Sequence, residues 1–116
     1  MEAKQIAEAL DTFSFHYQNE FDLQTGIGFV LTQMKAEFRR EVPLTKKDRI
    51  DFLVDKIGIE VKTDGSLAAV TRQLWRYAEC PEIDSLVLVT TRQAHRNMPD
   101  KLLGKPLFVV WLNVFH

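Results

Sequence analysis

The sequence predicts a single α/β domain in which helices flank a mixed β-sheet. Residues 3–38 carry apolar side chains at helical spacing, and the segments after them carry apolar side chains at strand spacing around a tight turn. The second half then alternates strand and helix patterns. The chain has 116 residues, of which 46% are hydrophobic and 27% charged, so residues 1–116 are expected to form one globular domain.

Two helices are expected at the start of the chain. One helical face of residues 3–14 carries Ile6, Ala7, Leu10 and Phe13. The apolar stripe of residues 19–38 comprises Phe21, Leu23, Ile27, Val30, Leu31 and Met34. Gly26 and Gly28 lie inside this second pattern, and they indicate either a break in the helix or close packing of the helix on a sheet.

Strands and a third helix follow. Strands are expected over residues 38–44, 49–54 and 56–62. The last two meet at Asp55 and Lys56, which predicts a tight hairpin. A helix is expected over residues 66–79, with Asp64 or Ser66 as its N-cap and a stop before Pro81. Its predicted core stripe is Leu67, Val70, Leu74 and Ala78, with Trp75 and Tyr77 beside it.

Two buried strands are expected in the remaining residues. Residues 85–91 are rich in β-branched side chains with little alternation, which is typical of a strand buried on both faces. A short helix or loop extends through residues 98–103, a break covers residues 104–106, and residues 107–114 form the last strand. A hairpin followed by strand–helix–strand order implies a sheet with antiparallel and parallel pairs.

Several function classes are not favoured by the composition. Cys80 is the only cysteine, so no disulfide can form within the chain, and His16, His95 and His116 have no zinc-ligand spacing. The opening residues lack the pattern of a targeting segment, and the longest apolar stretch, residues 107–112, is too short to cross a membrane. A cytoplasmic protein without a membrane partner is therefore expected.

Charge gives an ambiguous signal. The net charge is −1, which does not point to nucleic acid. A basic cluster does lie in the first half of the chain, formed by Lys35, Arg39, Arg40, Lys46, Lys47 and Arg49. Such a cluster can neutralise phosphates. Because Glu37, Glu41 and Asp48 interrupt it, a solvated face is the interpretation that charge alone favours.

The predicted hairpin carries the candidate catalytic residues. Alternation along a strand places Asp51 opposite the apolar side chains of its own strand, Ile50, Phe52 and Val54. It places Glu60 and Lys62 opposite the apolar side chains of the next strand, Ile57, Ile59 and Val61. If both apolar faces pack on one core, Asp51, Glu60 and Lys62 project to the same side, and strand pairing can bring Asp51 close to Glu60.

This combination of side chains suits metal-assisted phosphodiester hydrolysis. Two neighbouring carboxylates repel each other unless a cation compensates, and hard oxygen ligands suit Mg²⁺ or Mn²⁺. A lysine on the same face can assist a nucleophile or neutralise charge that develops on a phosphate. Glu-x-Lys is nevertheless common by chance, and any solvated strand face can carry it, so the three residues alone would be a weak signal.

The surrounding sequence strengthens that signal. Arg49-Ile-Asp-Phe-Leu-Val, followed by Gly58-Ile-Glu-Val-Lys-Thr, resembles the PD-(D/E)XK nuclease superfamily, also called restriction-endonuclease-like. The order of helix, hairpin, helix and strand also resembles its core, and the resemblance covers about residues 19–114. Ile50 stands where the family motif has Pro, a departure that the family tolerates. The resemblance implies a small phage- or resolvase-like member with a restriction-endonuclease-like mixed sheet flanked by helices.

The resemblance also implies roles for the hairpin residues. Asp51 and Glu60 would bind Mg²⁺ or Mn²⁺, with the backbone carbonyl of Val61 as a further ligand. Lys62 would assist the nucleophile or the transition state. The motif residues are intact, so the resemblance implies an active enzyme rather than an inactive relative.

Two helical residues match further features of the family. Glu20, on the helix before the hairpin, is the best match to an additional metal ligand and catalytic residue, ahead of Asp22 and Glu37. A solvated helix position explains Glu20 equally well. Gln73, on the helix after Glu-x-Lys, matches a glutamine of resolvase-like members that would orient a water or a ligand, and it is slightly favoured over an ordinary surface residue.

Basic and aromatic side chains are candidates for holding nucleic acid. The basic candidates are Arg49, Arg72, Arg76, Arg40 and Lys47. Taken singly, each is better explained as a solvated or salt-bridged residue. Trp75, Trp111 and Tyr77 can stack on unpaired bases, although core or interface roles are favoured for them.

The leading hypothesis is a Mg²⁺-dependent nuclease that cleaves nucleic acid, DNA in preference to RNA. The alternative is a nucleic-acid-binding or assembly module that keeps the fold without turnover, against which the intact motif argues. A structural α/β protein with a chance motif is the least favoured. A homodimer, formed through the C-terminal strand or Trp75, would supply more surface for the substrate.

Overall fold

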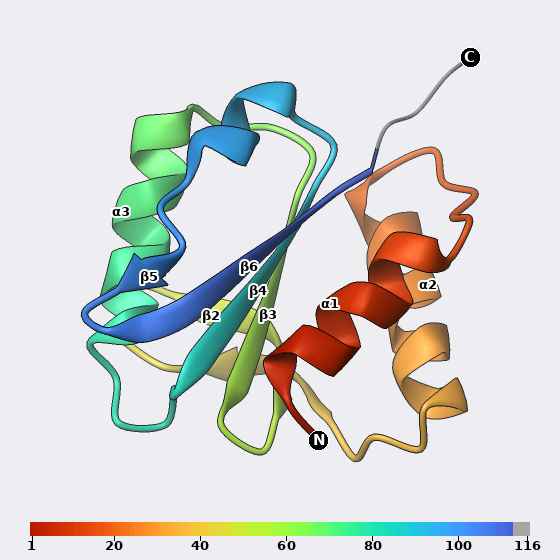
Figure 1. Cartoon of the computed structure of the whole chain (residues 1–116), viewed down its shortest axis with the longest axis horizontal. Coiled ribbons are helices and arrows are strands. Elements are labelled where there is room, and N and C mark those ends of the chain that lie inside the picture. Colours follow the sequence, from red (N-terminus) through yellow and green to blue (C-terminus); the bar gives the residue numbers. More distant parts are fainter. Residues whose placement is uncertain (113–116) are drawn as a thin grey trace.

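The computed structural model describes residues 1–112 and contains a mixed β-sheet with helices on both faces (Figure 1). The helices are α1 (Ala3–Thr12), α2 (Glu20–Gln33), α3 (Leu67–Ala78) and the 3₁₀ helix η1 (Gln93–Asn97). The strands are β1 (Arg39–Pro43), β2 (Arg49–Val54), β3 (Ile57–Lys62), β4 (Ser85–Thr90), β5 (Lys101–Leu102) and β6 (Lys105–Trp111). The predicted α/β class with a mixed sheet is confirmed.

Within the described residues, the sheet has six strands in the order β1-β2-β3-β4-β6-β5. The pairs β1–β2 and β2–β3 are antiparallel, β3–β4 and β4–β6 are parallel, and β5 pairs antiparallel with β6. Figure 1 shows α3 on one face of the sheet and α1 and α2 on the other. Within residues 1–112, no helix combines the length and the apolar character needed to cross a membrane.

The first two helices lie where the periodicity predicts them, but α2 ends five residues early. Asn19 caps α2 by accepting a hydrogen bond from the N–H of Asp22 at 2.8 Å. Lys35, with a φ of 60°, takes the chain out of the helix. Gly26 does permit close packing, because a Cβ there would lie 2.9 Å from the ring of Phe15. The contact comes from the loop before α2 rather than from the sheet.

The third helix begins as expected, but its buried face was only partly predicted. Ser66 caps α3 by accepting a hydrogen bond from the N–H of Ala69 at 3.1 Å. The buried face comprises Val70, Leu74, Tyr77 and Ala78. Tyr77 is 0% exposed, so its placement beside the core stripe was wrong. Tyr77 is three positions after Leu74 in the sequence, which puts both on one helical face.

The C-terminal part contains a strand that the sequence does not reveal. The predicted break at residues 104–106 was too long, since β6 already begins at Lys105. Leu103 and Gly104 have φ values of 52° and 75° and form a tight turn between β5 and β6. Two residues are too few to show a periodic pattern, which explains why β5 was missed. Residue 114, the predicted end of the last strand, and His116 lie outside the described residues.

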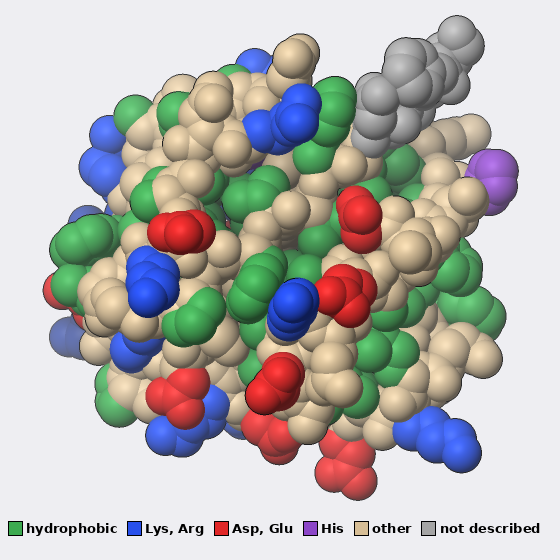
Figure 2. Space-filling model, viewed as in Figure 1, with side chains coloured by type: hydrophobic (Ala, Val, Ile, Leu, Met, Phe, Trp, Pro, Cys, Tyr) green, Lys and Arg blue, Asp and Glu red, His purple; other side chains and the backbone are tan. Residues whose placement is uncertain are grey.

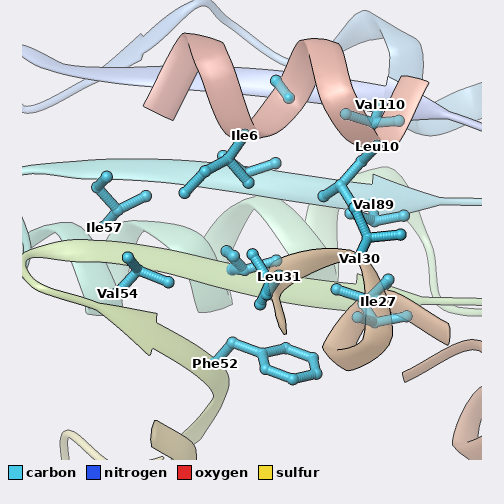
Figure 3. Close-up of a cluster of buried hydrophobic side chains, with 14 of the residues drawn as sticks. Ile6, Leu10, Ile27, Val30, Leu31, Phe52, Val54, Ile57, Val89 and Val110 are labelled. Carbon is cyan, nitrogen blue, oxygen red and sulfur yellow. The ribbon is translucent and has the colours of Figure 1, made fainter. Parts of the chain in front are cut away.

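Two hydrophobic clusters hold the layers together, one on each face of the sheet. Figure 3 shows helix side chains facing strand side chains across the cluster under α1 and α2, among them Ile6, Leu10, Ile27, Leu31, Phe52, Val54 and Val89. The second cluster packs α3 against the other face, with Leu74 and Tyr77 over Leu86 and Leu88.

The predicted alternation of side chains fails at one point in β2. Phe52 packs under α1 and α2, as Val54 does, whereas Ile50 packs under α3. The placement of all three on one face was therefore wrong for Ile50. The register aligns Asp51 with Glu41 of β1, whose φ of 52° lies in the left-handed region. The edge strand β1 is therefore irregular at Glu41, opposite the point where the side chains of β2 change from one face of the sheet to the other.

Candidate functional site

The candidate site lies where β2 and β3 separate. The backbone ladder between these strands ends at the pair formed by Phe52 and Ile59. Beyond this pair, hydrogen bonds between backbone N–H groups and the two carboxylates take the place of backbone–backbone hydrogen bonds. The N–H of Asp51 donates to Glu60 Oε1 at 3.2 Å, and the N–H of Val61 donates to Asp51 Oδ2 at 2.7 Å. The predicted proximity of Asp51 and Glu60 is confirmed.

Asp51 is held from the α2 side of the sheet. Gln24, a residue of α2 that is 8% exposed, donates from Nε2 to Asp51 Oδ1 at 3.2 Å. Arg40 of β1 donates from Nη2 to Gln24 Oε1 at 3.3 Å and stacks on the ring of Phe52, 5.2 Å from its centroid. Arg40 was a candidate for phosphate contact, but the structure makes it part of the support for Asp51.

Glu60 is held from the α3 side and is 3% exposed. Its Oε2 lies 3.4 Å from the hydroxyl of Tyr77 and 3.5 Å from Lys62 Nζ. The hydroxyl of Tyr77 also donates to the carbonyl of Arg49 at 2.8 Å. Glu60 and Lys62 thus face α3 while Asp51 contacts α2, so the placement of all three on one side was only partly correct. They meet at the gap between the strands.

The electrostatics of the pair are unfavourable in the protein alone. Burial, and then the charge of Asp51, raise the pKa of Glu60 to about 8. Burial also raises the pKa of Asp51, and the nearby charge of Glu20 adds to that increase. Lys62 opposes both shifts, but it does not cancel them. The two carboxylates therefore cannot both carry full charge at neutral pH without a further positive group.

Glu20 lies beside the pair, as expected for the best of the three candidates on this helix. Its Oε1 accepts a hydrogen bond from the N–H of Thr63, directly after Lys62, at 3.2 Å. Asp22 instead accepts a hydrogen bond from the N–H of Gln18, and Glu37 is exposed. Of these carboxylates, Glu20 is the one that the fold brings to the end of β3.

Gln73 reaches the site through another residue. Its Nε2 donates to the hydroxyl of Tyr77 at 3.1 Å, and that hydroxyl contacts Glu60. Burial, and then the charge of Glu60, raise the pKa of Tyr77, so its hydroxyl stays protonated as a donor. The contact that the structure shows for Gln73 is therefore with Tyr77, and its role toward a water or a ligand stays a prediction.

Sequence reasoning missed two supporting residues. Gln24 lies next to Leu23 within an apolar helical stripe, and an uncharged polar side chain at such a position is a signal of a buried hydrogen bond. Tyr77 was favoured for a core or interface role over base stacking, but a contact with the carboxylates was not predicted for it, although its spacing from Val70 and Leu74 marks it as buried. Neither signal names the partner, which comes from another element.

The basic candidates divide into paired and exposed residues. Arg76 donates to both carboxylate oxygens of Asp48, at 2.7 and 3.0 Å, which makes it a structural anchor. Lys47, Arg49 and Arg72 are exposed. On the face drawn in Figure 2, acidic and basic side chains are intermixed and neither sign forms a continuous patch. This face therefore offers no extended region of positive charge for nucleic acid.

The donor set determines which cation would fit. Within residues 1–112, no group of three or more His, Cys, Asp or Glu side chains is arranged to hold a metal ion. The pair of Asp51 and Glu60 supplies two carboxylates. Mg²⁺ commonly binds through one or two protein carboxylates and completes its shell with waters and substrate phosphates. The residues present therefore fit Mg²⁺ or Mn²⁺ shared with a substrate, and they do not fit a cation enclosed by protein ligands alone.

Comparison of the chain with models of protein families, with curated proteins and with solved structures finds no match. The structure establishes an α/β domain with a carboxylate pair, Asp51 half-buried and Glu60 buried, and an adjacent lysine at a strand separation. The family resemblance stays a prediction from the motif.

Proposed function

We propose that the chain is a metal-dependent nuclease with a restriction-endonuclease-like fold, acting on DNA in preference to RNA. The observation that carries the proposal is the pair of carboxylates formed by the half-buried Asp51 and the buried Glu60, with Lys62 Nζ 3.5 Å from Glu60. Such a cluster is costly for a fold that only needs stability, and perturbed carboxyl groups gather at functional sites. The intact Asp, Glu-x-Lys motif supports the same reading.

In this proposal Asp51 and Glu60 would hold Mg²⁺ or Mn²⁺, with the Val61 carbonyl and Glu20 as candidates for completing the shell. The cation would polarise a phosphoryl oxygen and lower the pKa of a water. Gln24 fixes Asp51 through its Oδ1, and Tyr77 fixes Glu60 through its Oε2. These contacts from two helices keep the carboxylates oriented.

Lys62 supplies the mobile positive charge of the site. Its side chain is 24% exposed, so it borders both the buried carboxylate and solvent. In the resting protein its ammonium group lies against Glu60. When a phosphate enters, the same group is near enough to donate to a phosphate oxygen or to the attacking water, which stabilises the negative charge of the transition state.

An inert nucleic-acid-binding or assembly module is the second candidate. It is favoured by the low exposure of Glu60, 3%, and by the fact that residues 1–112 hold no group of three metal-ligating side chains. A protein of this kind would bind nucleic acid with or without Mg²⁺ and would leave it intact.

Nuclease assays test the proposal. Single-stranded, double-stranded and branched DNA, and RNA, would be incubated with the wild type and Lys62→Ala in Mg²⁺, Mn²⁺ or EDTA. We expect metal-dependent cleavage that Lys62→Ala loses and that Lys4→Ala, at an exposed lysine of α1, keeps. Binding without cleavage under every condition would favour the inert module instead. The predicted homodimer is tested separately by sedimentation at working concentration.

A further inference from the structure

A rigid basic loop lies against α3. The carboxylate of Asp48, which is 7% exposed, accepts two hydrogen bonds from Arg76 of α3. Within the loop, the hydroxyl of Thr45 accepts from the N–H groups of Lys47 and Asp48 at 3.1 and 2.9 Å. These contacts hold the segment beside the helix, with the exposed Lys46 and Lys47 directly before Asp48 in the chain.

The loop and the helix together carry excess positive charge. Segments 44–49 and 67–79 contain five bases and two acids. One of the acids, Asp48, is already paired with Arg76. Exposed bases remain at Lys46, Lys47, Arg49 and Arg72. Exposed cations close together suit a chain of phosphates, because each can neutralise a phosphate and release its counterion.

Trp75 lies on the same exposed face of α3. It is 45% exposed, and its spacing of three residues places Arg72 beside it. An exposed indole next to cationic side chains is a common arrangement in proteins that bind single-stranded nucleic acid. The nucleobases stack on the ring, and the cationic side chains bind the phosphates. Trp111, by contrast, is half-buried, with the guanidinium of Arg96 4.4 Å from its ring centroid.

This surface is connected to the candidate site. The carbonyl of Arg49 accepts from the hydroxyl of Tyr77, which also contacts Glu60. Gln73, the neighbour of Arg72 on α3, donates to the same hydroxyl. Helix α3 therefore carries the exposed residues of this surface and, on its buried face, the tyrosine that contacts the carboxylate pair.

We propose that the surface formed by Lys46, Lys47, Arg72 and Trp75, here called the α3 surface, binds single-stranded nucleic acid, with an unpaired base stacked on Trp75. The inference rests on the proposed function, whose substrate class it names. A base inside a duplex is not free to stack on an indole. The exposed Phe21 and Phe29 of α2 give no equivalent surface, because α2 contains the acids Glu20 and Asp22 and no base.

The test is binding of fluorescently labelled oligonucleotides by anisotropy, in EDTA so that no cleavage occurs. We expect the wild type to bind a single strand more tightly than the matching duplex. Trp75→Ala should weaken single-strand binding on the order of tenfold to a hundredfold, whereas Trp75→Phe, which keeps a stacking ring, should retain most of the affinity. Phe29→Ala, at 54% exposed on the opposite face of the sheet, is the matched control and should bind as the wild type does.

The outcomes separate this inference from the nuclease proposal. Equal affinity of Trp75→Ala and wild type, or an equal loss in Phe29→Ala, would overturn the α3 surface even if the protein cleaves DNA. Tighter binding of duplex than of single strand would overturn it as well. Loss of single-strand binding in Trp75→Ala, in a protein that never cleaves, would support the surface and refute the nuclease.

Discussion

Asp48 and Asp51 are three positions apart in the sequence, yet they have opposite environments. Asp48 accepts two hydrogen bonds from Arg76, and this pairing holds the pKa of Asp48 below its ordinary value. Asp51, which is half-buried, faces the buried carboxylate of Glu60, and burial raises the pKa of both. One aspartate has a matched counter-charge, and the other shares a single lysine with a neighbouring acid.

The difference separates a structural from a functional polar cluster. The matched pair fixes a loop to a helix and leaves no charge for chemistry. The carboxylate pair costs folding free energy, because each buried charge destabilises the other. Natural sequences tend to break such local rules at functional sites and compensate elsewhere. Here the compensation comes from the two hydrophobic clusters and from Gln24 and Tyr77.

Glu60→Gln should give the largest effect. It removes one proposed cation ligand, and we expect cleavage to fall on the order of a hundredfold to a thousandfold. The same variant should unfold at a temperature about 5 °C higher than the wild type in EDTA at pH 8, because the repulsion with Asp51 is gone. Thermal unfolding and cleavage rates measure both. Loss of activity together with loss of stability would indicate an ordinary structural glutamate.

The pH dependence of stability in EDTA should show that the charged form of Glu60 is unfavourable in the folded protein. The pKa of Glu60 rises on folding from 4.5 to about 8, so the folded state favours the protonated acid. Its stabilising contribution is complete below pH 4.5 and is lost as the pH rises to about 8. Urea unfolding across this range should show falling stability for the wild type and a flatter curve for Glu60→Gln. Parallel curves would mean that Glu60 titrates normally.

Tyr77→Phe tests the support of the site. It removes the hydroxyl that contacts Glu60, Gln73 and the Arg49 carbonyl, and it should cost about 1–2 kcal/mol of stability. Tyr17→Phe, a half-buried tyrosine that packs in the cluster under α1 and α2, is the control and should cost less. Urea unfolding of both variants gives the comparison. Equal losses would show that the Tyr77 hydroxyl holds nothing in place.

Asp48→Asn should have the smallest effect. Arg76 is 42% exposed, and exposed ion pairs contribute little, so we expect the melting temperature to fall by at most a few degrees at pH 7. Because pairing lowers the pKa of Asp48, its contribution is present above about pH 4 and is lost as the pH falls through its folded value. The difference in melting temperature between variant and wild type should therefore disappear in acid. A difference that persists in acid would contradict the pairing of Asp48 with Arg76 as its cause.

Local pattern was sufficient for most of the elements and for the proximity of the two carboxylates. The two-residue hairpin turn fixes a register, with Phe52 opposite Ile59, that brings Asp51 close to Glu60. The reversal at Ile50 was not predictable, because it accompanies an irregular step at Glu41 in another strand. Gln24 meets Asp51 across 27 residues of sequence, so only the tertiary structure reveals that contact.

The most direct test of the central claim is the melting temperature at pH 8 with Mg²⁺ or with EDTA. If the carboxylate pair binds the cation, Mg²⁺ at a hundred times its dissociation constant should stabilise the wild type by about 2.7 kcal/mol and should leave Glu60→Gln unchanged. A wild type that does not respond to Mg²⁺, or a variant that responds as strongly, would show that the unmatched carboxylates are not a cation site.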